Sequence, residues 1–139
     1  MSAADLAALH ARCFEAPRPY TADEISGFLA DPACFLIGDS SGFAIGQVVL
    51  DEAELLTLAV DPDRRRRGVG REILQSFLRT AQKRGARRVF LEVASANEAG
   101  IGLYQTAGFA EIGRRKGYYR AGDGTTQDAI VMQIQLAEA

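Results

Sequence analysis

One stretch near the middle of the chain, residues 55–74, constrains the fold more than any other. It starts with a short aliphatic run, residues 55–60, which suits a buried strand that Asp61-Pro62-Asp63 stops in a turn. The basic sequence Arg64-Arg65-Arg66-Arg67-Gly68-Val69-Gly70 follows, and apolar residues then recur at helical spacing. Glycines at such a junction let the backbone approach a ligand, and the free amides of a helix N-terminus attract anions. The stretch therefore predicts an anion-binding site, most naturally for a pyrophosphate. The alternative is a surface turn with solvated arginines.

Composition limits the class of protein. The chain has 139 residues, 47% hydrophobic and 24% charged, as expected for one globular domain that buries roughly two-thirds of its unfolded surface. The net charge is −2, but residues 64–88 hold ten arginines and lysines against one acid, Glu72, which favours a local anionic partner. Two cysteines and one histidine give no metal or disulfide framework. With no signal peptide or apolar run of about 18 residues, we expect a cytoplasmic protein with no membrane partner.

Local patterns predict alternating helices and strands. Residues 1–14 have the pattern of an amphipathic helix. Thr21 and Glu24 form a capping box for a second helix, which ends at residues 31–32. Further helices are expected from the glycine loop to Gly85 and over residues 97–107, and residues 117–124 should be an irregular link. The order predicts a mixed α/β sheet with helices on its faces. Strands are expected at residues 34–37, 43–50, up to 60, 88–93, 109–115 and 129–136.

Two residues are candidates for acid–base chemistry. Glu92 carries the charge within the otherwise apolar run of residues 89–93, and burying an unpaired carboxylate is costly. It is either a general base for an amine or a strand residue that faces solvent. Tyr104 falls on the helix face expected toward the sheet. It is either a core aromatic residue or a neutral hydroxyl that can protonate a leaving thiolate.

Two ordered motifs resemble the GNAT acetyltransferase superfamily. Arg65-x-x-Gly68-x-Gly70 after a strand is similar to its acyl-CoA loop, [QR]-x-x-G-x-[GA]. Within the superfamily, residues 48–53, 59–63, 91–93 and 117–132 look like the RimI-type ribosomal-protein-alanine N-acetyltransferases, so the likeness covers roughly residues 43–132. The second signature, N-x-x-A-x-x-L-Y-x-x-x-G-F, is matched at Asn97, Leu103, Tyr104, Gly108 and Phe109.

The resemblance implies a GNAT fold over a single domain, residues 1–139, with a central, mostly antiparallel sheet, splayed middle strands and helices on both faces. It leaves open whether the N-terminal edge strand is missing, because the chain begins almost within the first helix. Acetyl-CoA would be the co-substrate, and no metal is implied. The residues implied to bind acetyl-CoA are Leu58, Ala59, Val60, Arg65, Arg66, Arg67, Gly68, Val69, Gly70, Arg71 and Asn97.

The same resemblance implies direct transfer of the acetyl group to a primary amine. Glu92 would be the base, directly or through water, and Tyr104 the acid. The implied acceptor is the N-terminal alanine α-amine of a small-subunit ribosomal protein. Tyr20, Tyr118 and Tyr119 are the expected acceptor-binding residues, because they lie in segments that match the substrate side of the family.

Several alternatives stay open. Asp51, Glu52 and Glu54 form either an acidic lip for a basic ribosomal protein or an ordinary solvated turn. The acceptor could be a small-molecule amine or a protein lysine, since residues 19–21 and 117–120 depart from the usual Pro-Trp-Ser and Asn-Tyr-Tyr-Pro. The non-enzyme alternative is a regulatory or nucleic-acid-binding module, but no aromatic residues interleave with the arginines, so we expect no direct nucleic-acid partner. Two further departures are Gly100 and Gly102, where alanines are usual, and we expect Cys13 and Cys34 to be core positions.

Overall fold

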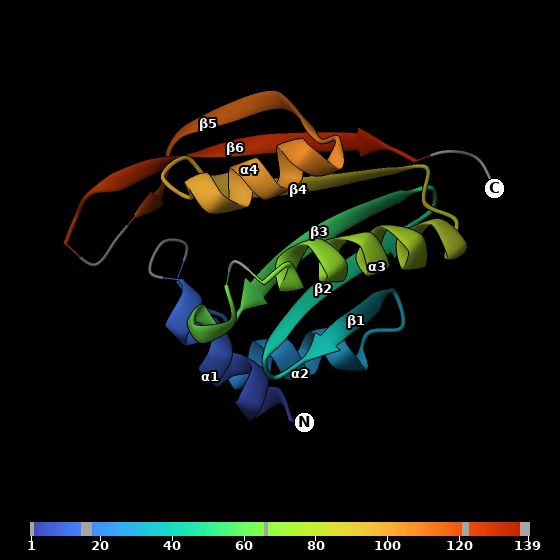
Figure 1. Cartoon of the computed structure of the whole chain (residues 1–139), viewed down its shortest axis with the longest axis horizontal. Helices are drawn as coiled ribbons and strands as arrows, with labels where there is room; N and C mark the ends of the chain where they lie inside the picture. The colour runs from blue at the N-terminus through green and yellow to red at the C-terminus, as the bar shows by residue number, and fades with distance from the viewer. Residues whose placement is uncertain (1, 15–17, 66, 121–122, 137–139) are drawn as a thin grey trace.

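A computed structural model describes residues 2–14, 18–65, 67–120 and 123–136, which form a mixed sheet with helices on both faces (Figure 1). No helix within these ranges is long and apolar enough to cross a membrane. The elements are α1 (Ala3–Cys13), α2 (Ala22–Ala30), β1 (Cys34–Asp39), β2 (Gly42–Val49), β3 (Glu52–Val60), the 3-10 helix η1 (Pro62–Arg64), α3 (Val69–Lys83), β4 (Arg88–Ala94), α4 (Glu98–Ala107), β5 (Ala110–Arg120) and β6 (Thr126–Gln135).

Side-chain caps fix where the first two helices begin. The Ser2 hydroxyl accepts a hydrogen bond from the Asp5 N–H at 3.2 Å, and the Asp5 carboxylate accepts one from the Ser2 N–H at 3.0 Å. Thr21 and Glu24 repeat this reciprocal arrangement at the start of α2, with both distances 3.1 Å. Each box satisfies two N–H groups that the helix itself leaves unpaired. The capping box predicted at Thr21 is confirmed.

The strand order in the sheet is β1-β2-β3-β4-β6-β5. Neighbouring strands run antiparallel except for β3 and β4, which are parallel. The prediction of a mixed, mostly antiparallel sheet is therefore confirmed. Within the described residues, no strand precedes α1, and β1 forms one edge of the sheet.

Two apolar clusters hold the helices against opposite faces of the sheet. The larger cluster joins α3 and α4 to the sheet through residues such as Leu74, Phe77 and Tyr104. The smaller cluster packs Leu6 of α1 and Ile25 of α2 against β2 and β3. Because the helices cover both faces, the middle strands are positioned from two sides.

The last two strands are longer than the sequence predicted. β5 continues to Arg120 instead of ending at residue 115, and β6 begins at Thr126 instead of residue 129. The register shifts between Arg115 and Tyr119, where Gly117 takes a φ of +60°, and pairing then resumes. Aromatic residues such as those at 118–119 favour strands. The prediction of an irregular link is therefore wrong for residues 117–120, and part of that link, residues 121–122, lies outside the described residues.

Candidate functional site

β3 and β4 separate in the middle of the sheet and leave a gap. They pair in parallel as far as Leu55↔Leu91. At the same point Leu56 is an extra residue in β3, because the residues on either side of it pair with consecutive residues of β2, Gly46 and Ile45. A bulge of this kind bends a strand and increases its twist. β3 therefore follows β2 while β4 follows β6, which confirms the predicted splay of the middle strands.

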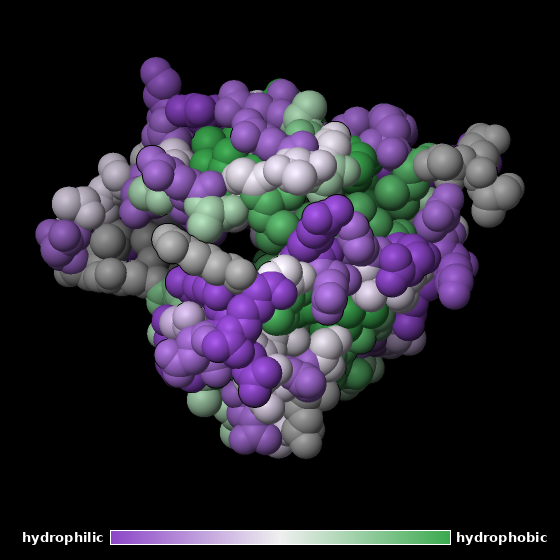
Figure 2. Space-filling model, in the orientation of Figure 1, coloured by the Kyte–Doolittle hydropathy of each residue, from purple (hydrophilic) through white to green (hydrophobic). Residues whose placement is uncertain are grey.

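A cavity of about 690 Å³, here called the larger cavity, opens at this gap. Its walls come from the end of β3, the loop before α3 and the first turns of α4. Figure 2 shows the surface hollowed between α4 and the loop that leads into α3. The predicted acetyl-CoA residues that line it are Leu58, Ala59, Val60, Arg65, Gly68, Val69, Gly70, Arg71 and Asn97.

The glycine loop presents the start of α3 to this cavity. Gly68 is the N-cap residue and has a φ of +77°, a left-handed conformation that glycine adopts at low cost. No described side chain caps the helix there, so the amides of its first turn have no acceptor within the helix. Ile73, Leu74 and Phe77 are buried and anchor α3 against the sheet. The free N–H groups and the positive end of the helix dipole thus suit a phosphate.

The arginines around the loop differ in position. Arg64, Arg65 and Arg71 line the larger cavity, where their charges can reach a bound anion. Arg67 is exposed and lies outside the cavity lining. Arg66 lies outside the described residues. Positive charge therefore borders the glycine loop both before and after it in the sequence.

Asn97 and Tyr104 contribute to the same cavity from the start and middle of α4. Asn97 caps the helix, because its Oδ1 accepts a hydrogen bond from the Gly100 N–H at 3.0 Å. A Cβ on Gly100 would lie 2.7 Å from the Asn97 Nδ2, so the glycine leaves room for this cap. Tyr104 is buried, with its ring edge-on to Phe109 at 5.8 Å between ring centres. Burial raises the pKa of the Tyr104 hydroxyl, which therefore stays protonated at neutral pH.

A second cavity of about 310 Å³, the smaller cavity, shares walls with the first. The shared lining residues are Phe14, Leu58, Ala94, Asn97 and Tyr104. The remaining walls come from α1, the segment before α2, and strands β3, β4 and β5. The other predicted residues found in this lining are Glu92, Tyr20, Tyr118 and Tyr119.

Glu92 faces the smaller cavity from β4, with its side chain 26% exposed. Its Oε1 lies 3.5 Å from Nη2 of Arg115, which comes from β5. The Arg115 guanidinium also lies 5.0 Å from the centre of the Tyr118 ring. Because the Arg115 side chain is 56% exposed, water screens this ion pair, which contributes at most about 1 kcal/mol. A cationic amine in the cavity can therefore compete with Arg115 for the carboxylate.

The three predicted acceptor tyrosines come from separate parts of the chain. Tyr20 is half-buried and packs edge-on against Phe28, with ring centres 5.2 Å apart. The rings of Tyr118 and Tyr119 lie 5.3 Å apart. Burial, and then the charge of Glu92, raises the pKa of Tyr119 to about 12, and burial also raises the pKa of Tyr20. Both hydroxyls are therefore neutral hydrogen-bond donors at neutral pH.

The acidic residues at the start of β3 border a third hollow of about 530 Å³. Its lining includes Asp51, Glu52, Glu54 and also Glu92. Glu54 lines the smaller cavity as well, and partial burial followed by the charge of Glu92 raises its pKa. Glu52 lies 3.9 Å from the Arg88 guanidinium. The carboxylates thus continue from the β2–β3 turn to the smaller cavity.

Sequence reasoning missed several residues of the site. His10 and Arg18 line the smaller cavity, and Phe14 lines both cavities. In the sequence, His10 and Phe14 are four residues apart within an amphipathic helix, and that pattern indicates packing alone. Arg18 follows the predicted helix break and carries no pattern of its own.

The prediction that both cysteines are core positions is wrong for Cys34, whereas Cys13 is partly buried and packs against the smaller apolar cluster. Cys13 and Cys34 are free and each is partly exposed. The Cys13 Sγ donates a hydrogen bond to the Val60 carbonyl at 3.2 Å, and Cys13 lines the larger cavity. Burial raises the pKa of its thiol, so the thiol is protonated at neutral pH. Within the described residues, no three His, Cys, Asp or Glu side chains are grouped to hold a metal ion.

Comparisons with known proteins agree with this geometry. The model of the acetyltransferase (GNAT) family matches residues 3–109. The ribosomal protein bS18-alanine N-acetyltransferase of Escherichia coli (strain K12) is 45% identical over 100 residues, which cover 72% of this chain and 67% of that protein. The protein of the same name from Haemophilus influenzae is 38% identical over 95 residues, which cover 68% and 64% of the two chains.

Solved structures have the same architecture. The crystal structure of the E. coli ribosomal-protein-S18-alanine N-acetyltransferase superposes with a TM-score of 0.86 at 34% identity, covering 99% of this chain and 89% of that chain. Arabidopsis thaliana NAA60 in complex with a bisubstrate analogue gives a TM-score of 0.85 at 19% identity, covering 99% and 94%, and this likeness concerns the fold alone. The motifs, the splayed sheet and these matches lead to one conclusion: the chain belongs to the GNAT acetyltransferase family and is an N-acetyltransferase with acetyl-CoA as its co-substrate.

Proposed function

We propose that this enzyme acetylates the α-amine of a protein N-terminus, and that its acceptor is a small-subunit ribosomal protein that begins with alanine. The observation that carries the proposal is the smaller cavity, which holds Glu92 and Tyr104 in its lining and shares walls with the larger cavity. The relatives named ribosomal protein bS18-alanine N-acetyltransferase supply the acceptor class. In this proposal residues 1–139 are a single acetyltransferase domain that works in the cytoplasm, where ribosomal proteins are made.

The larger cavity is the proposed acetyl-CoA site. Free amides at the start of α3 would bind the pyrophosphate, with Arg65 and Arg71 as charged partners. The residues 58–60 at the end of β3 would lie along the pantetheine arm. Asn97 uses its Oδ1 to cap α4, so its Nδ2 is the group that remains to donate a hydrogen bond to the ligand.

Glu92 is the proposed general base. A primary ammonium group is not nucleophilic, so it must lose a proton before its nitrogen attacks the acetyl carbonyl carbon. Glu92 faces the smaller cavity and can accept that proton directly or through a water molecule. The ammonium group first competes with Arg115, whose Nη2 lies 3.5 Å from the carboxylate.

The remaining steps use β3 and α4. Attack forms the C–N bond and places negative charge on the carbonyl oxygen. A backbone N–H near Val60 is the proposed donor to that oxygen, because within the described residues β4 no longer pairs with β3 beyond Leu55. The C–S bond then breaks, the protonated Tyr104 hydroxyl gives its proton to the leaving thiolate, and the nitrogen, cationic after attack, loses its second proton to solvent to give the amide. Solvent restores the proton on Tyr104.

The acceptor chain would lie between Tyr20 and the pair Tyr118 and Tyr119. Tyrosine offers a flat apolar face and a polar tip with few rotatable bonds, which suits a peptide backbone. The carboxylates of residues 51–54 would then meet basic residues that follow the N-terminal alanine, as expected in a ribosomal protein.

Mass spectrometry tests the proposed acceptor. The enzyme is incubated with acetyl-CoA and a synthetic peptide that begins with alanine and continues with arginine and lysine residues. We expect one acetyl group on the α-amine, and none when that amine is blocked although the lysines remain. Acetylation on lysine Nζ alone, or a preference for small amines over every peptide, would overturn the acceptor proposal and leave the acetyltransferase activity in place.

The proposed base has its own test. Glu92→Gln should lower kcat by roughly 10²–10⁴-fold, since it removes the proton acceptor. Its acetyl-CoA affinity should be nearly unchanged, because Glu92 does not line the larger cavity. The deficit should shrink at high pH, where more of the amine is already neutral. Asp23→Asn, an equivalent change on the exposed face of α2, is the control, and a normal rate for Glu92→Gln at neutral pH would refute the assignment.

A further inference from the structure

We propose that His10 is a positioning residue for the acceptor: its ring ties the Tyr20 wall of the smaller cavity to β3 at Thr57. The proposal rests on the proposed function in one respect, that the smaller cavity receives the acceptor. His10 does not take part in proton transfer in this scheme. It acts through Tyr20, which it holds by the backbone.

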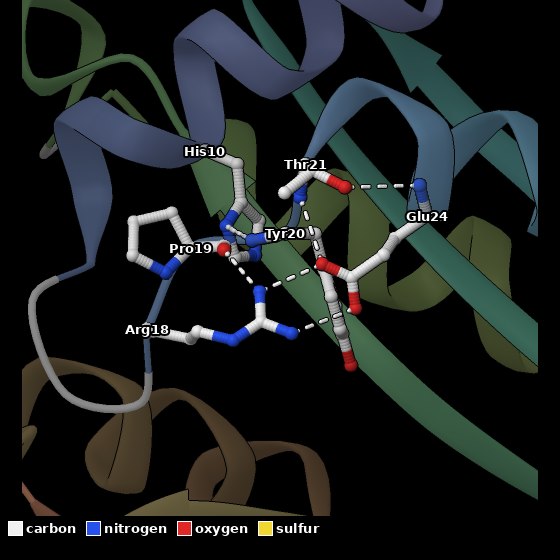
Figure 3. Close-up of polar contacts among 6 residues, drawn as sticks. All are labelled: His10, Arg18, Pro19, Tyr20, Thr21 and Glu24. Atoms are coloured by element: carbon white, nitrogen blue, oxygen red, sulfur yellow. Dashed lines mark hydrogen bonds and ion pairs between the residues drawn. The ribbon is translucent and has the colours of Figure 1, made fainter.

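The histidine ring is buried and uses both of its nitrogens. His10 is 2% exposed, and its Nε2 lies 2.8 Å from the Thr57 Oγ1. Its Nδ1 accepts a hydrogen bond from the Tyr20 N–H at 3.1 Å, a contact drawn in Figure 3. The rings of Phe14 and Tyr20 lie 4.4 Å and 5.0 Å from the His10 ring. Helix α1, the segment before α2 and strand β3 therefore meet at one imidazole.

The Tyr20 contact fixes the protonation state of the ring. A backbone N–H can donate but cannot accept, so Nδ1 must be the acceptor and the ring proton must lie on Nε2. The Nε2–H then donates to the Thr57 hydroxyl. Burial lowers the pKa of His10 to about 4, which the charge of Glu24 opposes, so the ring is neutral at neutral pH. Both hydrogen bonds are then present together.

The polar contacts of the residues that flank Tyr20 lie at the surface. Arg18 donates two hydrogen bonds to the Glu24 carboxylate, at 2.7 Å and 3.0 Å, and the Thr21 N–H donates to the same carboxylate (Figure 3). The Arg18 side chain is 69% exposed, so water screens its ion pair. These contacts fix the residues on either side of Tyr20. Tyr20 itself is held from the interior at its backbone N–H by His10, at its hydroxyl, which donates to the Leu56 carbonyl of β3 at 3.5 Å, and by its packing against Phe28.

The position of Tyr20 matters because His10 connects it to Thr57, which lies next to a residue that lines both cavities. Thr57 is followed in β3 by Leu58, which lines both cavities. His10 therefore links a wall of the acceptor cavity to the strand end that borders the proposed acetyl-CoA site. A displaced Tyr20 wall would fit the acceptor chain less closely, so the binding of the acceptor would weaken.

Two substitutions test the two hydrogen bonds of the His10 ring one at a time. His10→Gln places an amide nitrogen near the former Nε2 and can still donate to Thr57, but it has no atom at the Nδ1 position. His10→Asn places an amide oxygen near the former Nδ1 and can still accept from the Tyr20 N–H, but it loses Thr57. Each variant gives up one hydrogen bond of the ring, the part-buried one to Tyr20 or the buried one to Thr57, so both should lose thermal stability.

Steady-state kinetics with a peptide that begins with alanine show whether His10 positions the acceptor or only stabilises the fold. We expect His10→Gln to raise the KM for the peptide roughly tenfold, because the part-buried Tyr20 N–H loses its acceptor and no longer fixes the cavity wall. Its kcat and its acetyl-CoA Kd should stay within about twofold of the wild type. For His10→Asn, the KM for the peptide should lie within about threefold of the wild-type value. Equal peptide KM values for the two variants would overturn the proposal.

Hydrogen exchange of the Tyr20 amide, followed by NMR in the enzyme without substrate, gives a readout independent of activity. The amide should exchange at least about tenfold faster in His10→Gln than in the wild type or in His10→Asn. If the wild type acetylates no alanine peptide, the proposed function fails, and the exchange rates still decide the role of His10. Equal Tyr20 exchange in His10→Gln and the wild type would overturn that role.

Discussion

Lowering the pH from 7 to 5 should destabilise the folded enzyme by about 2 kcal/mol through the titration of His10. Burial lowers the pKa of His10 in the folded protein from 6.5 to about 4. Between these two values the unfolded chain binds the proton and the folded chain does not. Acid therefore favours unfolding across this range, and the effect of His10 is complete below about pH 4.

Other groups titrate in or near the same range, so a matched variant is needed. Hydrogen bonds hold the pKa values of Asp39, Asp61 and Asp123 below the usual value, and their loss of stability therefore falls mostly at lower pH. The raised pKa of Glu54 acts in the opposite direction, because the folded state then binds its proton more readily. His10→Gln removes the histidine titration and leaves these four carboxyls in place.

Urea unfolding of the wild type and of His10→Gln at pH 7, 6 and 5 measures the effect. With a slope of about 1–3 kcal/mol per molar urea, the wild-type midpoint should fall by roughly 1 M between pH 7 and pH 5. The midpoint of the variant starts lower and should change much less. Coincident fluorescence and circular dichroism transitions would establish two-state unfolding. Equal midpoint shifts in the two proteins would refute a buried, neutral His10.

Three further substitutions test the packing around the site. Gly46→Ala should lower the free energy of unfolding by about 1–3 kcal/mol in thermal denaturation, because the new Cβ would lie 2.6 Å from the Phe77 Cζ; unchanged stability would contradict the tight contact. Gly102→Ala should instead stabilise the enzyme by about 0.5–1 kcal/mol, because its Cβ meets no atom within 4 Å in α4; a loss of stability would contradict that open space. Gly68→Val should raise the acetyl-CoA Kd at least about tenfold, measured by calorimetry, because valine is strained at a φ of +77°. Normal affinity would refute the glycine loop as the anion-binding site.

Sequence reasoning succeeded where the pattern is local. The capping box at Thr21 and Glu24 and the glycine loop each lie within a few consecutive residues, and the structure places both as predicted. Helix α4 is also a local pattern, from its Asn97 N-cap to the left-handed Gly108 at its end. These elements depend on backbone groups close in the chain, so their spacing carries the information.

Sequence reasoning failed where two distant segments decide the outcome. His10 and Thr57 are 47 residues apart, and the sequence around neither residue predicts their hydrogen bond. Arg115 reaches Glu92 from β5, although β6 lies between β5 and β4. The length of β5 depends on pairing with β6 after a shift of register near Gly117. Each of these facts requires the tertiary arrangement, either the packing of α1 on the sheet or the order of the strands, which no local pattern specifies.

The extra residue in β3 connects the fold to the site. Before it, Leu55 faces α3 and belongs to the larger apolar cluster. After it, Thr57 pairs with Ile45 and faces α1, where it meets His10. With strict alternation Thr57 would share the face of Leu55 and lie beyond the reach of His10, because successive side chains of a strand point to opposite faces. The pairing of β3 with β4 also ends at this residue, where the two cavities open. One shift of register at Leu56 therefore separates the strands that line both cavities and turns Thr57 toward the histidine that holds the acceptor wall.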